Sequence, residues 1–185
     1  MNKWRQKNSV RYRYNQTAFS YDERYFDEQQ SKYKVALEGV KIDRGFIVLD
    51  VGCGTGLFFG HIAKKSSLIV GVDISKKLLL QANVRAKSCG NVCVVLCDAD
   101  FLPFADNCFH LVFAFTVLQN MPNPVQTLCE FNRVSLPAGS MVVTALKRAI
   151  ALDVFADMLD QAKLKTILLK DDKSLCCNIV VTIKT

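Results

Sequence analysis

Three glycines alternate with other residues directly behind an acid in the segment 48–57, which reads VLDVGCGTGL. Because glycine has no Cβ, such a loop lets backbone pass closely beneath a ligand where a side chain would clash. Further along the chain, at the end of the next apolar run, Asp73 is placed to accept hydrogen bonds from both hydroxyls of a ribose. This combination predicts a nucleotide-like ligand.

The details of this glycine loop discriminate between nucleotide ligands. A dinucleotide fingerprint reads G-x-G-x-x-G, whereas Leu57 occupies the position of the third glycine here. Asp50 adds a carboxylate at the mouth of the loop, which would repel a pyrophosphate and suit a ligand with an ammonium or sulfonium charge. A nicotinamide-dependent oxidoreductase is therefore disfavoured. A tight turn without any ligand is the plain alternative.

Apolar strands and amphipathic helices alternate around the loop. Apolar runs predict strands at 46–51, 67–73, 91–97, 109–115, 140–146, 164–169 and 178–184, and helical patterns fall at 57–65, 75–87, 124–134 and 148–163. The link between the last two strands is too short for a parallel crossover, so they should pair antiparallel. We expect an α/β fold: a Rossmann-like, doubly wound sheet of seven strands, mostly parallel, with an antiparallel C-terminal strand.

Five segments, in order, resemble the class I S-adenosylmethionine-dependent methyltransferases, in particular the type 11-like group with small seven-stranded domains. These segments are VLDVGCGTG, GVDIS, CDADFLPFADNCFHLV, FTVLQNMPNP and the turn Pro137-Ala-Gly139. The resemblance covers residues 28–185. It implies transfer of a methyl group from S-adenosylmethionine to an acceptor, with S-adenosylhomocysteine as product. We therefore divide the chain into a basic and aromatic N-terminal segment, 1–27, and a methyltransferase domain, 28–185.

The same resemblance implies a set of residues that bind the cofactor. Asp50 and the loop at Gly52, Cys53, Gly54 and Gly56 would hold the methionine end, Asp73 the ribose, Ile74 and Leu78 the adenosine, Asp98 and the Ala99 amide the adenine, and the Phe115 carbonyl the amino group. For Asp98 the alternative is an ordinary turn residue at the end of a strand.

The acceptor and the catalytic residue are not identified by the sequence. After the fourth strand many relatives carry His-His or similar, but this chain has Gln119 and Asn120. Their amides cannot act as general bases near pH 7, although they can orient a nucleophile. Together with Tyr14 and Tyr21 from the aromatic segment 12–30, they are the candidate acceptor-binding residues. The acceptor can be a small molecule, an RNA or a protein, and the aromatics can equally be core residues of a first helix.

Positive charge is concentrated at the N-terminus. The chain carries a net charge of +7, and five of its basic residues lie in the first thirteen positions without any acid: Lys3, Arg5, Lys7, Arg11 and Arg13. One interpretation is a solvated, partly disordered terminus. The other is an arm that contacts nucleic-acid phosphates, with Trp4 or Tyr12 stacking on a base. The second interpretation supports an alternative function, a non-enzymatic protein that binds RNA or another partner on a methyltransferase-like fold.

The cysteines and the hydropathy pattern limit the remaining function classes. None of the eight cysteines belongs to a CxxC pair, so we expect no metal site, and most should pack in the core, with Cys93 and Cys97 on a buried strand. The vicinal pair Cys176-Cys177 keeps a thiol-dependent or metalloid-binding alternative. No apolar run is long enough for a membrane span, and the N-terminus does not resemble a secretory signal. We expect a cytoplasmic protein.

Overall fold

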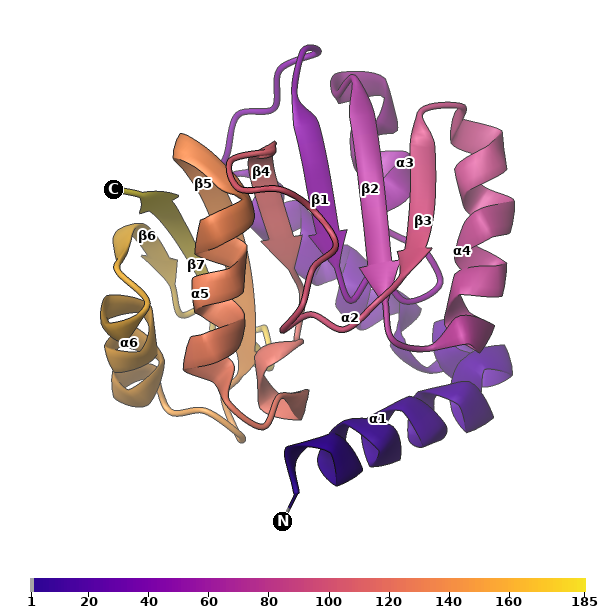
Figure 1. The fold of residues 1–185 in the computed structure, drawn as a ribbon, viewed down its shortest axis with the longest axis horizontal. Helices are drawn as coiled ribbons and strands as arrows, with labels where there is room; N and C mark the ends of the chain where they lie inside the picture. The colour runs from indigo at the N-terminus through magenta and orange to yellow at the C-terminus, as the bar shows by residue number, and fades with distance from the viewer. Residues whose placement is uncertain (1) are drawn as a thin grey trace.

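One seven-stranded sheet forms the centre of the computed structural model, which describes residues 2–185 (Figure 1). The strands lie in the order β3-β2-β1-β4-β5-β7-β6. Strands β1 to β5 run parallel, whereas β7 runs antiparallel to both β5 and β6. The predicted Rossmann-like α/β fold with an antiparallel C-terminal strand is therefore confirmed.

From β1 onwards the elements follow the predicted order along the chain. The strands are β1 Ile47–Val51, β2 Leu68–Asp73, β3 Val92–Leu96, β4 Phe109–Ala114, β5 Ser135–Leu146, β6 Leu164–Lys170 and β7 Cys177–Lys184. The helices are α1 Lys3–Thr17, α2 Tyr21–Leu37, α3 Phe59–Ile62, α4 Lys76–Cys89, α5 Pro124–Val134 and α6 Leu152–Gln161, with short 3-10 turns at Ala18–Ser20, Ala63–Lys65 and Leu118–Asn120.

Two apolar cores cover the two faces of the sheet. Phe131 of α5 and Phe155 of α6 are fully buried in one of them, and α2, α3 and α4 supply the helical residues of the other. Successive residues of a strand point to opposite faces, so Leu49 packs in the first core and Val48 in the second. The sheet is thereby buried on both sides, and the carboxyl ends of its parallel strands form one common edge.

Three details of the secondary structure differ from the sequence prediction. The helix predicted at 57–65 is split into α3 and a 3-10 turn, and α6 begins only at Leu152. The predicted turn at 137–139 lies inside β5, where Ala138 has a φ of 59° and the register with β4 shifts. These differences concern ends and irregularities of elements, which local patterns define weakly.

Strand β3 is not the buried strand that its apolar residues predict. It lies at the end of the sheet and pairs only with β2, and both Cys93 and Leu96 are exposed. The expectation that Cys93 lies on a buried strand is therefore wrong. An apolar run shows that a segment can form a strand, but the strand order decides whether neighbours cover it.

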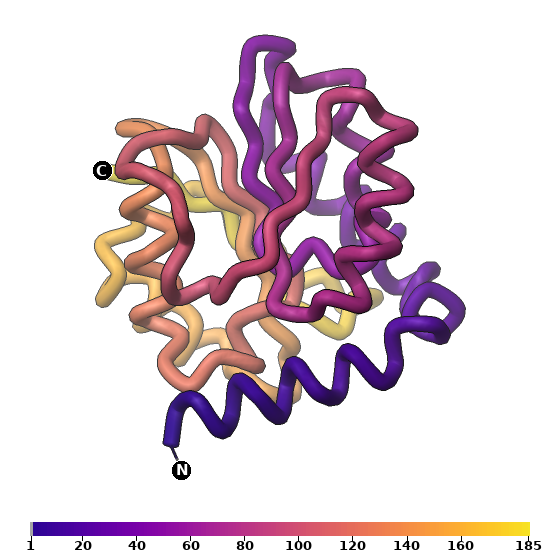
Figure 2. Tube along the Cα trace, turned by 45° about the vertical axis from the view of Figure 1, so that its right-hand side comes forward, coloured from indigo at the N-terminus to yellow at the C-terminus, as the bar shows by residue number. Residues whose placement is uncertain are grey.

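The first helix lies across the carboxyl ends of the parallel strands. Figures 1 and 2 show α1 running past the ends of β1, β2 and β3, with its N-terminus on the side of α5. Residues 3–17 are therefore ordered helix, and the interpretation as a disordered terminus is wrong. No helix within residues 2–185 combines the length and the apolar character that a membrane crossing requires.

Candidate functional site

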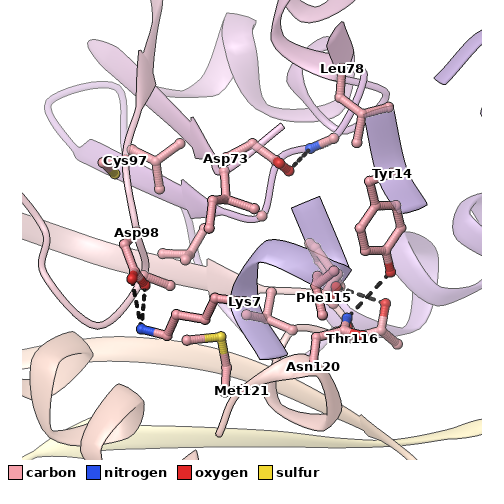
Figure 3. A pocket seen from close by; sticks show the side chains of 18 of the residues that line it. Lys7, Tyr14, Asp73, Leu78, Cys97, Asp98, Phe115, Thr116, Asn120 and Met121 are labelled. Atoms are coloured by element: carbon pink, nitrogen blue, oxygen red, sulfur yellow. Dashed lines mark hydrogen bonds and ion pairs between the residues drawn. The ribbon is translucent and has the colours of Figure 1, made fainter. Parts of the chain in front are cut away.

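A cleft lies at the carboxyl ends of the strands, beneath α1. Its main part, which opens to solvent, is here called the upper cavity. Loops after β1, β2, β3 and β4 form its floor, and Lys7, Val10 and Tyr14 of α1 form its roof (Figure 3). The order of the strands reverses between β1 and β4, which is the place where open α/β sheets bind ligands.

The glycine loop after β1 is held against the end of β2 by a carboxylate. The Gly54 N–H donates to one oxygen of Asp73 at 3.0 Å, and the Ser75 N–H donates to the other at 2.8 Å. Gly52 and Gly54 have φ values of 68° and 57°, a backbone region that strains other residues. Burial raises the pKa of Asp73 above its ordinary value. The loop and the acid predicted to bind a ribose thus line one cavity.

A smaller space, here called the lower cavity, lies beneath the glycine loop and contains two buried oxygens without donors. Asp50 is 2% exposed and Gln29, from α2, is 6% exposed. Neither Asp50 Oδ2 nor Gln29 Oε1 finds a hydrogen-bond donor among residues 2–185. Burial, with a smaller contribution from Asp73, raises the pKa of Asp50 well above its ordinary value.

Such unpartnered buried acceptors are costly unless a ligand supplies the donor. An ammonium group has three donors and a positive charge, so it would satisfy both oxygens and favour the charged form of Asp50. The amino end of S-adenosylmethionine carries this group. The lower cavity therefore fits the cofactor that the sequence implies, and Gln29 is a residue that sequence reasoning missed.

The end of the upper cavity beside β3 contains the residues predicted to meet adenine. Asp98 and Ala99 line it together with Leu78 and Cys97. Burial, followed by the charge of Asp98, raises the pKa of the Cys97 thiol to about 12. Because the thiol stays protonated near neutral pH, Cys97 is a wall of the cavity and not a nucleophile.

A lysine from α1 occupies the same end of the cavity. Lys7 Nζ lies 2.8 and 2.7 Å from the two oxygens of Asp98, and 2.5 Å from an oxygen of Asp100 (Figure 3). The lysine is 5% exposed, although the sequence indicated a solvated charge or a phosphate contact. Because Lys7 is buried and paired with two carboxylates, it is no longer a candidate for contact with nucleic-acid phosphates.

The opposite end of the upper cavity contains candidate acceptor residues. Asn120 Nδ2 donates to the Tyr14 hydroxyl at 3.3 Å, and Arg13 donates to Asn120 Oδ1 at 2.9 Å. Tyr21 lines both cavities, and its pKa is raised, first by burial and then by Tyr14. Tyr21 therefore remains a neutral phenol at pH 7 and can donate a hydrogen bond.

Two predicted residues lie outside both cavities. The side chain of Gln119 turns back and donates to the Thr116 carbonyl. Gly56 faces the core, where a Cβ would lie 2.5 Å from the ring of Phe59. Among the other aromatics of segment 12–30, Phe19, Tyr25 and Phe26 are exposed, so they are neither core residues nor cavity residues.

The side chains of the vicinal cysteines lie in different environments, because successive side chains of an extended chain point in opposite directions. Cys177 is fully buried, whereas Cys176 is exposed and donates to the Glu28 carboxylate at 3.0 Å. Burial raises the pKa of Cys177 to about 11. The two thiols do not converge on one ligand, so the pair has no joint metalloid-binding geometry. Residues 2–185 contain no group of three or more His, Cys, Asp or Glu side chains that could hold a metal ion.

The glycine loop lies within a segment that matches a known protein family. A family profile described as a methyltransferase domain matches residues 49–143, about half of the chain. The demethylmenaquinone methyltransferase of Tropheryma whipplei (strain Twist) is 32% identical over 138 residues, covering 72% of this chain and 57% of the relative. The chain thus spans little more than half the length of this curated relative.

Solved structures share the whole fold. In the complex between the Haloferax volcanii Trm112 methyltransferase activator and the putative methyltransferase, the aligned chain has a TM-score of 0.80 and 17% identity, over 92% of this chain and 97% of that one. The [4+2]-cyclase SpnF aligns with a TM-score of 0.76 and 20% identity, over 83% and 80% of the two chains. Similarity at this level of identity shows the fold and not the reaction.

Proposed function

Because the chain belongs to the class I S-adenosylmethionine-dependent methyltransferases, we propose that it transfers the methyl group of S-adenosylmethionine to a small-molecule acceptor and releases S-adenosylhomocysteine. The observation that carries this proposal is the pair of buried oxygens without donors, on Asp50 and Gln29, beneath the glycine loop. The similarity to a demethylmenaquinone methyltransferase supports an acceptor of low molecular weight.

The cofactor would lie along the carboxyl ends of the strands. Asp50 and Gln29, with the Phe115 carbonyl, would hold its amino group, and Asp73 would accept from the ribose hydroxyls. Asp98, the Ala99 amide, Ile74 and Leu78 would surround the adenine. The backbone of Gly52, Cys53 and Gly54 would approach the methionine part of the cofactor closely. The chemistry supplied by bound S-adenosylmethionine is a methyl group that the neighbouring sulfonium already activates.

The protein itself must position the acceptor against the methyl group and exclude water from the site. Helix α1 forms a roof over the upper cavity through Val10 and Tyr14. Alignment of a nucleophile with a methyl group held in place can contribute about 7–11 kcal/mol to catalysis. The fold therefore needs no strong acid or base to accelerate the transfer.

The acceptor end of the cavity limits the class of nucleophile. Its polar side chains, Tyr14, Tyr21, Thr116 and Asn120, are neutral groups that orient a substrate without removing a proton. Burial keeps Tyr21 protonated. We infer an acceptor whose nucleophile reacts without a strong base, such as an amine, a thiolate or the anion of an acidic carbon or oxygen.

We further infer a nucleic-acid contact through the exposed basic residues of α1. Lys3, Arg5 and Arg11 are exposed on this helix, as are Trp4 and Tyr12, which can stack on bases. Charge reversal at Arg5 and Arg11 should weaken binding of single-stranded RNA and lower the salt slope by about 0.7 for each phosphate that is no longer neutralised. Charge reversal at the exposed Arg24 of α2 is the matched control. An unchanged salt slope in the Arg5 and Arg11 variants would contradict the proposed interaction with RNA.

We also infer a reducing compartment, and hence the cytoplasm. All eight cysteines are free in the part of the chain that the structure describes. Thiols of this number normally stay unpaired only where the compartment keeps them reduced.

The proposed function is tested by methyl transfer itself. The protein is incubated with S-adenosylmethionine labelled in its methyl group and with fractions of a cell extract. We expect label in a small-molecule fraction, and none with a variant that carries Asp50→Ala. Label only in RNA or protein would correct the acceptor class. Absence of label in every fraction would favour a binding protein without activity.

A further inference from the structure

The contacts of α1 with the rest of the molecule are mostly polar. Lys7 is the one buried residue among Lys3–Thr17. Asn8 Oδ1, on the same helix, is buried and finds no donor among residues 2–185. A helix that buries little apolar surface and leaves a polar atom unsatisfied is held weakly in its place. Its position over the cleft therefore depends on a few specific contacts.

The two ends of α1 are attached in different ways. Near the C-terminal end, Asn15 Oδ1 accepts from Ser75 Oγ at 2.8 Å, and Gln81 donates to the carbonyl of the buried Ala18 at 2.8 Å. These contacts join the helix to α4. The N-terminal half lies over the upper cavity and is held by Lys7, while Lys3 makes only a 3.5 Å contact with Gln126. The C-terminal end is thus the fixed end, and Lys7 holds the other.

Lys7 uses the same carboxylate that the cofactor needs. Its ammonium lies within 2.8 Å of both oxygens of Asp98, and its side chain lines the cavity beside Ala99 (Figure 3). If Asp98 accepts a hydrogen bond from the adenine amine, then the adenine amine and the Lys7 ammonium compete for the same carboxylate. Asp100, which is 6% exposed and also pairs with Lys7, lies outside the cavity lining and adds to the hold on the helix.

We propose that α1 is a lid over the cofactor site, latched by the ion pair of Lys7 with Asp98, and that adenine binding at Asp98 releases the latch. This proposal rests on the proposed function, because it takes Asp98 as the adenine acceptor. The ion pair closes the site when it is empty. Binding of the cofactor lifts Lys7 with the helix, away from both carboxylates.

The chain contains its own reporter for this movement. Trp4 is the only tryptophan in the sequence, lies on α1 one turn before Lys7, and is about half exposed. Its fluorescence and its quenching by acrylamide report on the lid without any measurement of activity. S-adenosylhomocysteine, which carries the same adenine, is the ligand to titrate.

The latch is tested with Lys7→Met, which keeps the length of the side chain but removes the ammonium. Arg5→Met is the matched control, because it removes the same charge from an exposed position of the same helix. Since Lys7→Met leaves Asp98 and Asp100 without their cation, Asp100→Asn is a second variant. It weakens the latch and leaves Lys7 and the adenine acceptor in place.

In the wild type, we expect S-adenosylhomocysteine to change the quenching of Trp4. Lys7→Met should show the changed quenching before ligand is added. If the open form makes up about one-tenth of the wild-type molecules, Lys7→Met should bind about tenfold more tightly. The ligand affinity and Trp4 quenching of Asp100→Asn should lie between those of the wild type and Lys7→Met. Those of Arg5→Met should match the wild type.

Two results would overturn the latch alone: ligand binding that leaves Trp4 quenching unchanged in the wild type, or folded Lys7→Met and Asp100→Asn proteins that bind no more tightly than the wild type. Absence of binding in the wild type and in every variant, at millimolar ligand, would instead overturn the proposed function and the latch with it.

Discussion

The carboxylate of Asp50 and the side-chain amide of Gln29 line the same small cavity, and each keeps one buried oxygen without a donor. They come from β1 and α2, which follow one another along the chain, 21 residues apart at these two positions. A cationic donor between them would remove the cost that both oxygens impose on the free protein. Four predictions follow from this relationship and from the geometry around it.

Gln29→Met should separate ligand binding from stability. The substitution keeps the shape and removes the unpartnered oxygen together with the long, 3.5 Å contact from Gln29 Nε2 to the Tyr21 hydroxyl. Because that contact is at the limit of hydrogen-bond length and a buried polar atom without a partner no longer opposes folding, the melting temperature should stay the same or rise. Affinity for S-adenosylhomocysteine should fall about 5- to 30-fold, as expected for the loss of about 1–2 kcal/mol. Calorimetric titration and thermal unfolding measure the two effects.

The neighbouring Gln30 provides the control for this substitution. Gln30 lies on the same helix and lines neither cavity of the site. Gln30→Met should leave ligand affinity unchanged. Equal decreases in affinity for the two variants would show that Gln29 acts through the helix and not through the ligand.

The stability of the free protein should depend on the charge state of Asp50. Its folded pKa is raised by burial, so its contribution to stability is favourable below its ordinary value, near pH 4, and is lost as the pH rises through the folded pKa. The wild type should therefore lose stability relative to Asp50→Asn over this window. Ligand affinity should change in the opposite direction and rise with pH, because the carboxylate is the form that binds an ammonium. A difference between the two unfolding curves that does not vary with pH would contradict this prediction.

Gly56→Ala should destabilise the fold more than Gly90→Ala. Both glycines have a positive φ, 79° and 81°, so alanine imposes a similar backbone strain at either position. At Gly90 the new Cβ meets no atom within 4 Å, whereas at Gly56 it lies 2.5 Å from the Phe59 ring. The overpacking should add about 1–3 kcal/mol, or roughly 2–12 °C in melting temperature. Equal melting temperatures for the two variants would show that Phe59 moves freely.

Asn120→Ala should impair methyl transfer and leave cofactor binding intact. Asn120 lines the upper cavity and contacts Tyr14 and the Thr116 carbonyl, neither of which is assigned to the cofactor. Loss of a hydrogen bond of about 1–1.5 kcal/mol predicts a decrease of roughly 5- to 12-fold in kcat/KM. Gln119→Ala should have a smaller effect, because Gln119 lies outside both cavities. A larger decrease in kcat/KM for Gln119→Ala would reverse this assignment.

Much of the fold follows from local sequence. The apolar runs identify all seven strands, and the short link before β7 correctly predicts its antiparallel direction. The exposure of β3 was not predictable in this way, because a run such as 91–97 does not show how many neighbours the strand will have. Strand order, which places β3 at an edge, is decided by the packing of the whole chain.

The site divides in a similar manner. Asp73 and Asp98 were predictable from the local sequence, because each acid directly follows or ends an apolar strand within a segment that resembles a known cofactor-binding motif. Gln29 has no such local signal, since a polar residue within a helix is buried or exposed according to what the helix packs against. Lys7 belongs to a basic run that indicated solvent or phosphate, yet its partner Asp98 lies 91 residues away in the sequence. Contacts of this range appear only in the folded chain.

We propose that the site binds S-adenosylmethionine through its amino group, ribose and adenine. Thermal unfolding with S-adenosylmethionine or S-adenosylhomocysteine tests this binding most directly, with NAD as the comparison. A ligand at 100 times its dissociation constant adds about 2.7 kcal/mol. For a chain of this size the melting temperature should rise by roughly 5–11 °C with either S-adenosyl compound and stay unchanged with NAD. No rise with the S-adenosyl compounds at millimolar concentration, or an equal rise with NAD, would contradict the account.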